Sequence, residues 1–144
     1  MPSRTIRDVI RDQNILTLPG KTTIRKAACD MTSRRVGSVM VVEGGQLVGI
    51  FTERDALVRV LAAGLDPETA TLDQIMTADP TVIPVTASLS QALHVMHDGG
   101  FRHLPVVEGG KPVGMVSLRD AAGGEILAFE RQLKDKAALE GILG

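Results

Sequence analysis

The sequence predicts an α+β fold in which two similar β-α-β-β-α units are followed by a C-terminal helix. The first indication is an internal repeat, because residues 16–57 align without a gap with residues 81–122 of the 144-residue chain. Each copy also contains two apolar runs joined by a Glu-Gly-Gly turn, which is typical of a β-hairpin. Each hairpin then ends in a hydroxyl residue with an aspartate three positions later, Thr52 with Asp55 and Ser117 with Asp120.

The elements of the first unit follow from its hydrophobic pattern. Ile24, Ala27, Ala28 and Met31 recur at helical spacing, so we expect them on the inner face of a helix. The run at 38–42 is apolar throughout, which indicates a buried strand. The predicted elements are a lead-in helix at 5–11, a strand at 15–18, a helix capped by Thr22 or Thr23 and ending near Ser33, strands at 38–42 and 47–51, and a helix from 53 to about 63 that Thr52 caps and Gly64 ends.

The second unit repeats this plan and is followed by an additional helix. The predicted elements are a lead-in helix at 71–76, a strand at 81–85, a helix that starts with the capping box Ser88–Gln91 and ends at 98, strands at 104–107 and 112–116, a helix from 118 that Gly123-Gly124 interrupt, and a final helix at 125–143. Ile126, Phe129, Leu133 and Ala137 form a stripe on the final helix, which we expect to pack on the body or on a second copy of the chain.

These elements predict three parts, at 1–64, 65–124 and 125–144. A unit of about 60 residues is marginally stable alone, so we expect the two units to pack face to face and share a core.

Composition excludes several function classes. A net charge of −1 and 2% aromatic residues argue against a nucleic-acid binder. No apolar run reaches the roughly 20 residues that span a membrane, and the N-terminus does not resemble a signal peptide. The single cysteine, Cys29, fits a reducing, cytoplasmic location, and we expect it to be a buried structural thiol. His94 and His97 lack a third ligand nearby, so we expect an exposed polar face and no metal site.

The repeated hydroxyl–carboxylate corner has two interpretations. A hydroxyl with an acid three residues later forms a helix cap. Alternatively, the free N–H groups of a helix start attract phosphate, while the acid accepts hydrogen bonds from ribose hydroxyls. Arg54 and Arg119, one residue before each aspartate, add positive charge. Because the whole corner is duplicated, the sequence favours binding, and no nucleophile–base pair or metal cluster suggests an enzyme.

The order strand–helix–strand–glycine turn–strand–(Thr/Ser)-x-x-Asp–helix, present twice over residues 5–122, resembles a tandem pair of CBS (cystathionine β-synthase) domains, also called a Bateman module. The resemblance implies two units related by pseudo-two-fold symmetry, with clefts between them that bind AMP, ADP, ATP, NAD(H) or S-adenosylmethionine. It also implies a non-catalytic regulatory module that acts as an energy or ligand sensor, that forms a homodimer, and whose effector is another, unidentified protein. The alternative is a protein-interaction scaffold of the same fold without a nucleotide.

The resemblance assigns site residues one by one. Asp55 and Asp120 would bind the ribose diol. The residues that would contact phosphate are Thr52, Arg54, Ser117 and Arg119. The residues that would line the opposite walls are Gly37 and Ser38 in one half and Arg102 and His103 in the other. Backbone at Ile15, Pro80 and Val82 would contact adenine.

The two halves differ in charge. Arg102-His103 carries one or two positive charges where Gly37-Ser38 carries none. If ligand contacts cross between the halves, as the resemblance implies, the Asp55 site gains both residues. We therefore expect that site to bind the more phosphorylated ligand.

Overall fold

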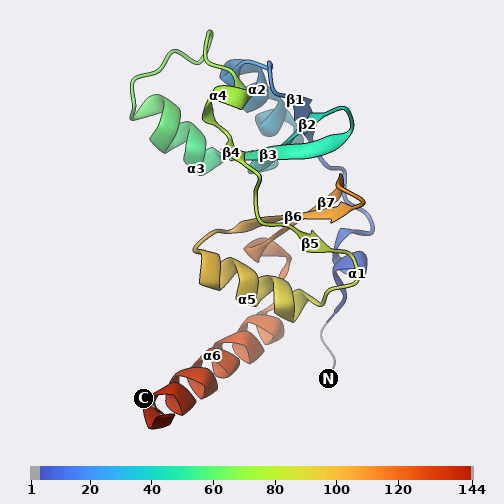
Figure 1. Cartoon of the computed structure of the whole chain (residues 1–144), viewed down its shortest axis with the longest axis vertical. Helices are drawn as coiled ribbons and strands as arrows, with labels where there is room; N and C mark the ends of the chain where they lie inside the picture. The colour runs from blue at the N-terminus through green and yellow to red at the C-terminus, as the bar shows by residue number, and fades with distance from the viewer. Residues whose placement is uncertain (1–3, 144) are drawn as a thin grey trace.

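The computed structural model describes residues 4–143, so the ends of the predicted parts at 1–3 and 144 lie outside the described residues. It consists of two halves, one per repeat, each with a small sheet and helices packed on it (Figure 1). The last helix leaves the lower half and extends away from both sheets (Figure 1). The predicted α+β fold of two units and a C-terminal helix is confirmed.

The first sheet has the strand order β1-β2-β3-β4. Its strands are β1 (Thr17–Pro19), β2 (Ser38–Glu43), β3 (Gln46–Thr52) and β4 (Thr77–Ala78). β1 pairs in parallel with β2, and β2 and β3 form the predicted antiparallel hairpin. β1 lies further along the chain than the strand predicted at 15–18. β4 was not predicted, since two residues carry no readable alternation.

The second sheet repeats this arrangement with three strands, in the order β5-β6-β7. They are β5 (Ile83–Pro84), β6 (His103–Glu108) and β7 (Lys111–Ser117). Both hairpins turn through two glycines with φ between 56° and 80°, a left-handed conformation that glycine adopts without steric cost. The two hairpins also share a register irregularity at the same place, Val41/Val42 and Val106/Val107.

Two long helices begin as the sequence predicts. Thr23 caps α2 (Ile24–Arg34) by accepting a hydrogen bond from the Lys26 N–H. Ser88 and Gln91 form the predicted capping box at the start of α5 (Leu89–Gly99). Cys29 is exposed on α2, so the prediction of a buried thiol was wrong. It lies off the helix face that packs inward, which carries Ala27 and Met31.

Each lead-in helix packs in the other half of the molecule. α1 (Ile6–Ile10) lies in the core of the second half, where Ile6 is fully buried beside Leu89 and Leu104. α4 (Leu72–Ile75) lies in the core of the first half, where Leu72 is fully buried with Phe51. The residues that the structure describes therefore form two separate hydrophobic cores, and the expectation of one shared core was wrong. The chain joins the halves by exchanging these helices.

Hydrogen bonds and one closely packed glycine, Gly114, fix this exchange. The Ile6 N–H donates to the Ala87 carbonyl (N···O 2.9 Å). The Leu72 N–H donates to the Thr22 carbonyl, also at 2.9 Å. A Cβ on Gly114 would lie 2.6 Å from Cγ2 of Ile10, so only glycine lets α1 approach β7 this closely.

The helices that follow the two corners differ from the prediction. The expected helix at 53–63 is one turn of α-helix, α3 (Glu53–Asp55), followed by the π-helix η1 (Ala56–Leu61). The expected helix from 118 is a single 3₁₀ turn, η2 (Leu118–Asp120), because Ala121 adopts an extended conformation. α6 (Gly123–Leu143) then begins two residues before the predicted start. The Glu125 carboxylate caps it by accepting the Ala122 N–H at 2.8 Å.

α6 packs on the body only near its start. Its Phe129 ring contacts the rings of His94 and His97 on α5 edge-on, with centroid separations of 4.9 and 5.8 Å. Leu133 is half-buried, whereas Ala137 is exposed. The predicted stripe therefore covers the body over its first two turns. His94 and His97 both contact the Phe129 ring. His94 is half-buried, so the expectation of an exposed polar face was wrong for this residue, whereas His97 is exposed as expected.

Within residues 4–143, no helix combines the length and apolar character needed to cross a lipid bilayer.

Candidate functional site

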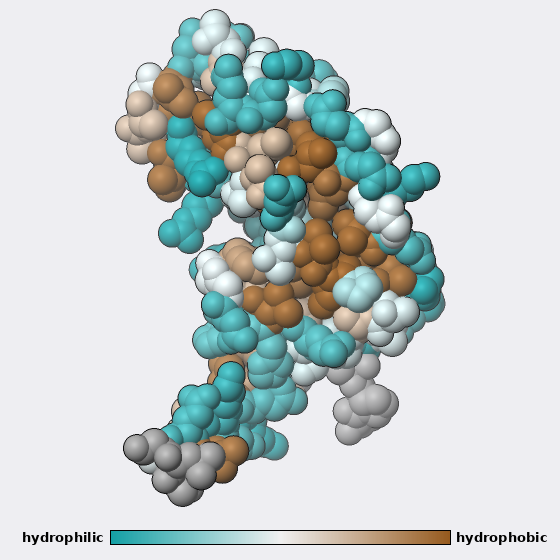
Figure 2. Space-filling view, in the orientation of Figure 1, coloured by the Kyte–Doolittle hydropathy of each residue, from teal (hydrophilic) through white to brown (hydrophobic). Residues whose placement is uncertain are grey.

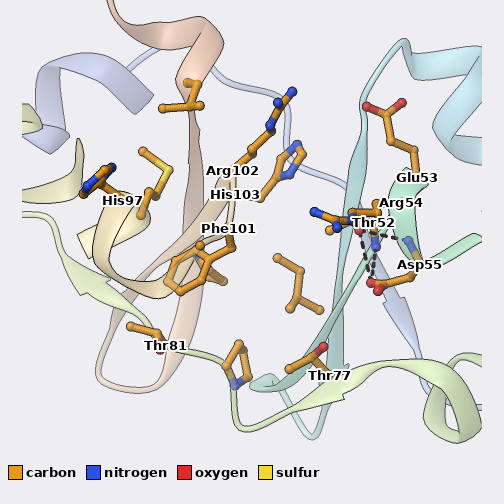
Figure 3. A pocket seen from close by; sticks show the side chains of 16 residues that line it. Thr52, Glu53, Arg54, Asp55, Thr77, Thr81, His97, Phe101, Arg102 and His103 are labelled. Carbon is orange, nitrogen blue, oxygen red and sulfur yellow. Dashed lines mark hydrogen bonds between the residues drawn. The ribbon is translucent and has the colours of Figure 1, made fainter. Parts of the chain in front are cut away.

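The Thr52–Asp55 corner is a complete helix cap. Oδ2 of Asp55 accepts the Thr52 N–H at 2.9 Å, and the Thr52 hydroxyl accepts the Asp55 N–H at 3.3 Å. Figure 3 shows this pair on one wall of a cavity. Oδ1 of Asp55 takes no part in these bonds and lies 3.9 Å from Nε of Arg59. The cap therefore uses one carboxylate oxygen and leaves the other for a further partner.

Arg59 links this corner to the end of α4 in the same half. Its Nη1 donates to the Ile75 carbonyl at 2.7 Å, at the end of α4. One residue, Met76, separates Ile75 from β4, and Thr77 of β4 lines the cavity. The repeat places Gly124 where the first half has Arg59, so the second corner lacks this link.

The Ser117–Asp120 corner also forms a capping box, with a shorter bond from the backbone N–H to the carboxylate. Oδ2 of Asp120 accepts the Ser117 N–H at 2.7 Å and the Ser117 hydroxyl at 3.4 Å. Arg4 holds the backbone here, because its Nη2 donates to the Asp120 carbonyl at 2.6 Å. Arg4 also pairs with Glu125 at 2.8 Å, which ties the start of α6 to the corner.

A cavity of about 700 Å³, which we call the Asp55 cleft, opens between the two halves in front of the first corner. Figure 2 shows the molecule hollowed at this edge, between the half that carries α3 and the half that carries α5. In Figure 3, Phe101, Arg102 and His103 face the Thr52–Asp55 corner from the opposite wall. The volume lies within the range of sites that enclose small organic ligands. Apolar side chains and a few convergent polar groups line it, as in such sites.

A second cavity of about 280 Å³, the Asp120 cleft, lies in front of the other corner. Gln13 is part of its lining, and its side-chain amide bonds both backbone groups of Met115, accepting from the N–H at 2.9 Å and donating to the carbonyl at 2.6 Å. In the first half, the corresponding residue Ile50 pairs with Thr77 of β4 instead. A side chain thus takes the position that a strand occupies in the first half.

The structure brings twelve of the thirteen predicted site residues to the two clefts. The Asp55 cleft is lined by Thr52, Arg54, Asp55, Pro80, Arg102 and His103. The Asp120 cleft is lined by Ile15, Gly37, Ser38, Ser117, Arg119 and Asp120, and also by His103. Val82 lines neither cleft and is 41% exposed. The expected meeting of Asp55 with Arg102 and His103 across the halves is present in the geometry.

Several lining residues were not identified from the sequence. The Asp55 cleft also contains His97 and Phe101, and the Asp120 cleft also contains Gln13 and Arg35. His97 and Phe101 lie near the end of α5, just before the predicted pair Arg102-His103. Arg35 likewise lies just before the predicted pair Gly37-Ser38. In both halves, the segment between the helix and the next strand therefore contains the lining residues that the sequence analysis missed.

His103 lies where the two clefts meet and is largely neutral near pH 7. Burial lowers the pKa of His103 below its usual value, and nearby Arg119 lowers it further, while Glu53 opposes the shift. The pair Arg102-His103 therefore supplies one positive charge to the Asp55 cleft, the lower of the two numbers that the sequence allowed.

Comparisons with known proteins agree with this architecture. The CBS domain family model matches residues 6–62 and again residues 72–123. A CBS domain-containing protein of Arabidopsis thaliana, CBSCBSPB3, is 32% identical over 137 residues, covering 94% of this chain. The chain spans only about a quarter of the length of that relative and of the similar ones beside it. The mitochondrial CBSX3 protein of the same plant is 31% identical, with 92% of this chain and 69% of the relative covered.

Solved structures show the same fold. A CBS domain protein from Pyrobaculum aerophilum, complexed with AMP, superposes with a TM-score of 0.78 at 25% identity, covering 88% of this chain and 98% of its own. A protein from Pyrococcus horikoshii gives a TM-score of 0.76 at 28% identity, covering 83% and 90%. Since the family model matches both repeats and the fold agrees along most of the chain, this protein belongs to the CBS domain family and carries a tandem pair of CBS domains.

Proposed function

We propose that this chain is a non-catalytic regulatory module that binds an adenine nucleotide between its two CBS domains and acts as an energy or ligand sensor. One observation carries the proposal. Asp55 and Arg102 come from different halves, yet both line one cavity of about 700 Å³. A ligand that contacts both would bind one arrangement of the halves more tightly than another, which a sensor requires. The related protein from Pyrobaculum aerophilum is complexed with AMP, which supports an adenine nucleotide as the ligand.

The residues of the Asp55 cleft suit the parts of such a ligand. Oδ1 of Asp55 can accept hydrogen bonds from a ribose diol, while Oδ2 keeps the cap. Arg54 and Arg102 can bind phosphate oxygens as charged donors. Neutral His103 can donate one further hydrogen bond. Pro80, Phe101 and Pro105 offer an apolar surface for the base. AMP, ADP, ATP and NAD(H) all share these parts.

Calorimetric titration of the full chain with AMP, ATP and NADH tests this proposal. We expect saturable binding of at least one of the three, because each carries the ribose diol and phosphate that the cleft can bind. Absence of binding to all three by a folded sample would favour the scaffold function instead. Circular dichroism of the same sample establishes that it is folded.

We further propose that the module forms a homodimer through η1. Four apolar side chains of this helix and the residues after it are 44% to 73% exposed, namely Leu57, Val58, Leu61 and Leu65. Apolar side chains gather at the outer edge of this helix in Figure 2. A contiguous apolar patch of this kind marks an interaction surface.

Leu61→Glu should reduce the mass in solution from that of a dimer towards the 15.3 kDa of one chain. A charge on this patch would be buried without a partner in the dimer. Light scattering measures the mass, and the exposed Leu139 of α6, replaced in the same way, is the matched control. A Leu61→Glu protein with unchanged mass would exclude η1 as the interface. The identity of an effector protein and the predicted cytoplasmic location stay predictions from the sequence.

A further inference from the structure

Arg35 stands at a backbone position that favours glycine. It ends α2 in the left-handed conformation, with φ 56° and ψ 42°. The corresponding residue at the end of α5 is Gly100, with φ 72° and ψ 28°. Glycine adopts this conformation without steric cost, whereas arginine does not. The end of α2 therefore does not explain why an arginine side chain is present here.

Arg35 lines two adjoining cavities. One is the Asp120 cleft, of about 280 Å³. The other, of about 400 Å³, lies between α2 and the start of η1, and we call it the outer groove. Both are lined by Arg35, Val36, Gly37 and Arg119. Because the two cavities share these four residues, they adjoin one another.

The groove carries two cations whose charge is weakly compensated. Arg35 forms no ion pair with any side chain that the structure describes. Arg119 has one long contact, 3.9 Å from Nη2 to Oε1 of Glu53, and its side chain is 79% exposed. Glu53 is the carboxylate in the groove, and Asp120 is the one in the cleft. Guanidinium groups suit phosphate because two N–H groups can bind its oxygens together.

We propose that the Asp120 cleft and the outer groove form one channel for a nucleoside di- or triphosphate, with the outer phosphates bound by Arg35 and Arg119. This inference rests on the proposed nucleotide-binding function. The cleft alone lies just below the usual volume of small-molecule sites, so a nucleoside at Asp120 places its phosphates towards the groove. Gly37 lines both spaces, and a Cβ at this residue would lie 3.0 Å from Oε1 of Glu53 and 3.4 Å from Nε2 of His103, so a ligand that fills the channel must displace the flexible Glu53 side chain.

This channel changes the charge comparison between the halves. The sequence analysis expected the more phosphorylated ligand in the Asp55 cleft because Arg102 and His103 can carry positive charge, whereas Gly37 and Ser38 cannot. His103 is largely neutral, and Arg35 adds a charge on the other side. Each side then carries two arginines, Arg54 and Arg102 at the Asp55 cleft and Arg35 and Arg119 at the Asp120 cleft, so charge no longer favours the Asp55 side. The outer groove beside the Asp120 cleft gives that side the additional space that a longer phosphate chain needs.

Arg35→Gly tests this assignment without disturbing the fold, because glycine suits the left-handed conformation at 35. The variant is made in an Asp55→Asn background, which weakens the other cleft, and AMP and ATP are titrated by calorimetry. We expect ATP affinity to fall about tenfold, as for loss of one charge-assisted contact, and AMP affinity to change less than about twofold. Thermal unfolding should be unchanged.

Arg25→Ala in the same background is the matched control, because it removes a charge from α2 at a residue that lines neither cavity. It should leave both affinities unchanged. If ATP binds the Arg35→Gly protein as tightly as the background protein, or if Arg25→Ala weakens ATP equally, the channel is wrong while nucleotide binding stands. If the wild-type chain binds neither nucleotide, the proposed function fails and the channel fails with it.

Discussion

Asp55→Asn should weaken AMP binding by about 10- to 100-fold, which corresponds to the loss of a hydrogen bond to a charged acceptor worth about 1.5–3 kcal/mol. The carboxylate has two separate roles in this structure. Oδ2 holds the cap with the Thr52 N–H, and Oδ1 is left for the ribose. Asparagine keeps one carbonyl oxygen for the cap, so the change removes the charged acceptor with little effect on the fold. Calorimetric titration with AMP measures the effect.

Asp120→Asn is the matched variant in the other repeat. It sits in an equivalent cap but lines the other cleft. We expect it to leave the Asp55 cleft unaffected and to weaken only binding at its own corner. If nucleotide affinity is unchanged in both variants, neither Asp55 nor Asp120 binds the ribose.

Ile6→Ala should lower the free energy of unfolding by about 2–5 kcal/mol, the usual cost of truncating a buried isoleucine. Ile6 is fully buried, although it lies near the N-terminus in a helix of only five residues. Its burial comes from the core of the second half, with Leu89 and Leu104. Chemical denaturation measures the loss.

Hydrogen exchange shows where that loss acts. The amides of β6 should lose protection more than those of β2, because α1 packs on the second half. Arg7→Ala, on the exposed face of the same helix, should change stability by less than about 0.5 kcal/mol. Loss of protection confined to β2 and β3 would contradict the exchange of lead-in helices.

The repeat made most of the fold predictable. Paired glycines placed both hairpins, because only a few residue types adopt the positive φ of those turns. Thr23 and Ser88 marked the starts of α2 and α5, since hydroxyl caps leave a short local signature. These features depend on residues close together in the chain, which a sequence shows directly.

The features that the sequence did not reveal depend on distant contacts. The lead-in helices look like parts of their own repeats, and only packing shows that Ile6 and Leu72 exchange halves. Cys29 was expected to be buried, but the face of α2 that packs inward carries Ala27 and Met31, and Cys29 lies outside that face and is exposed. α6 keeps a helical pattern along its length, yet the body supports only the part around Phe129.

Most of the candidate site could also be predicted from the sequence, but only through the resemblance to a known family. The resemblance to CBS pairs identified residues that lie at the two clefts of the fold. Their positions in the sequence alone do not show that residues of different halves line the same cleft. Arg35 was missed because the comparison of the halves began at Gly37. The charge state of His103 was left open because it depends on burial.

Nucleotide binding between the two halves can be seen directly in a crystal structure of the full chain grown with AMP. We expect an adenosine moiety in the Asp55 cleft, with its ribose hydroxyls within hydrogen-bond distance of Oδ1 of Asp55 and its phosphate near Arg54 or Arg102. A well-ordered structure from such crystals, with the side chains of the cleft closed upon one another and AMP elsewhere or absent, would contradict it.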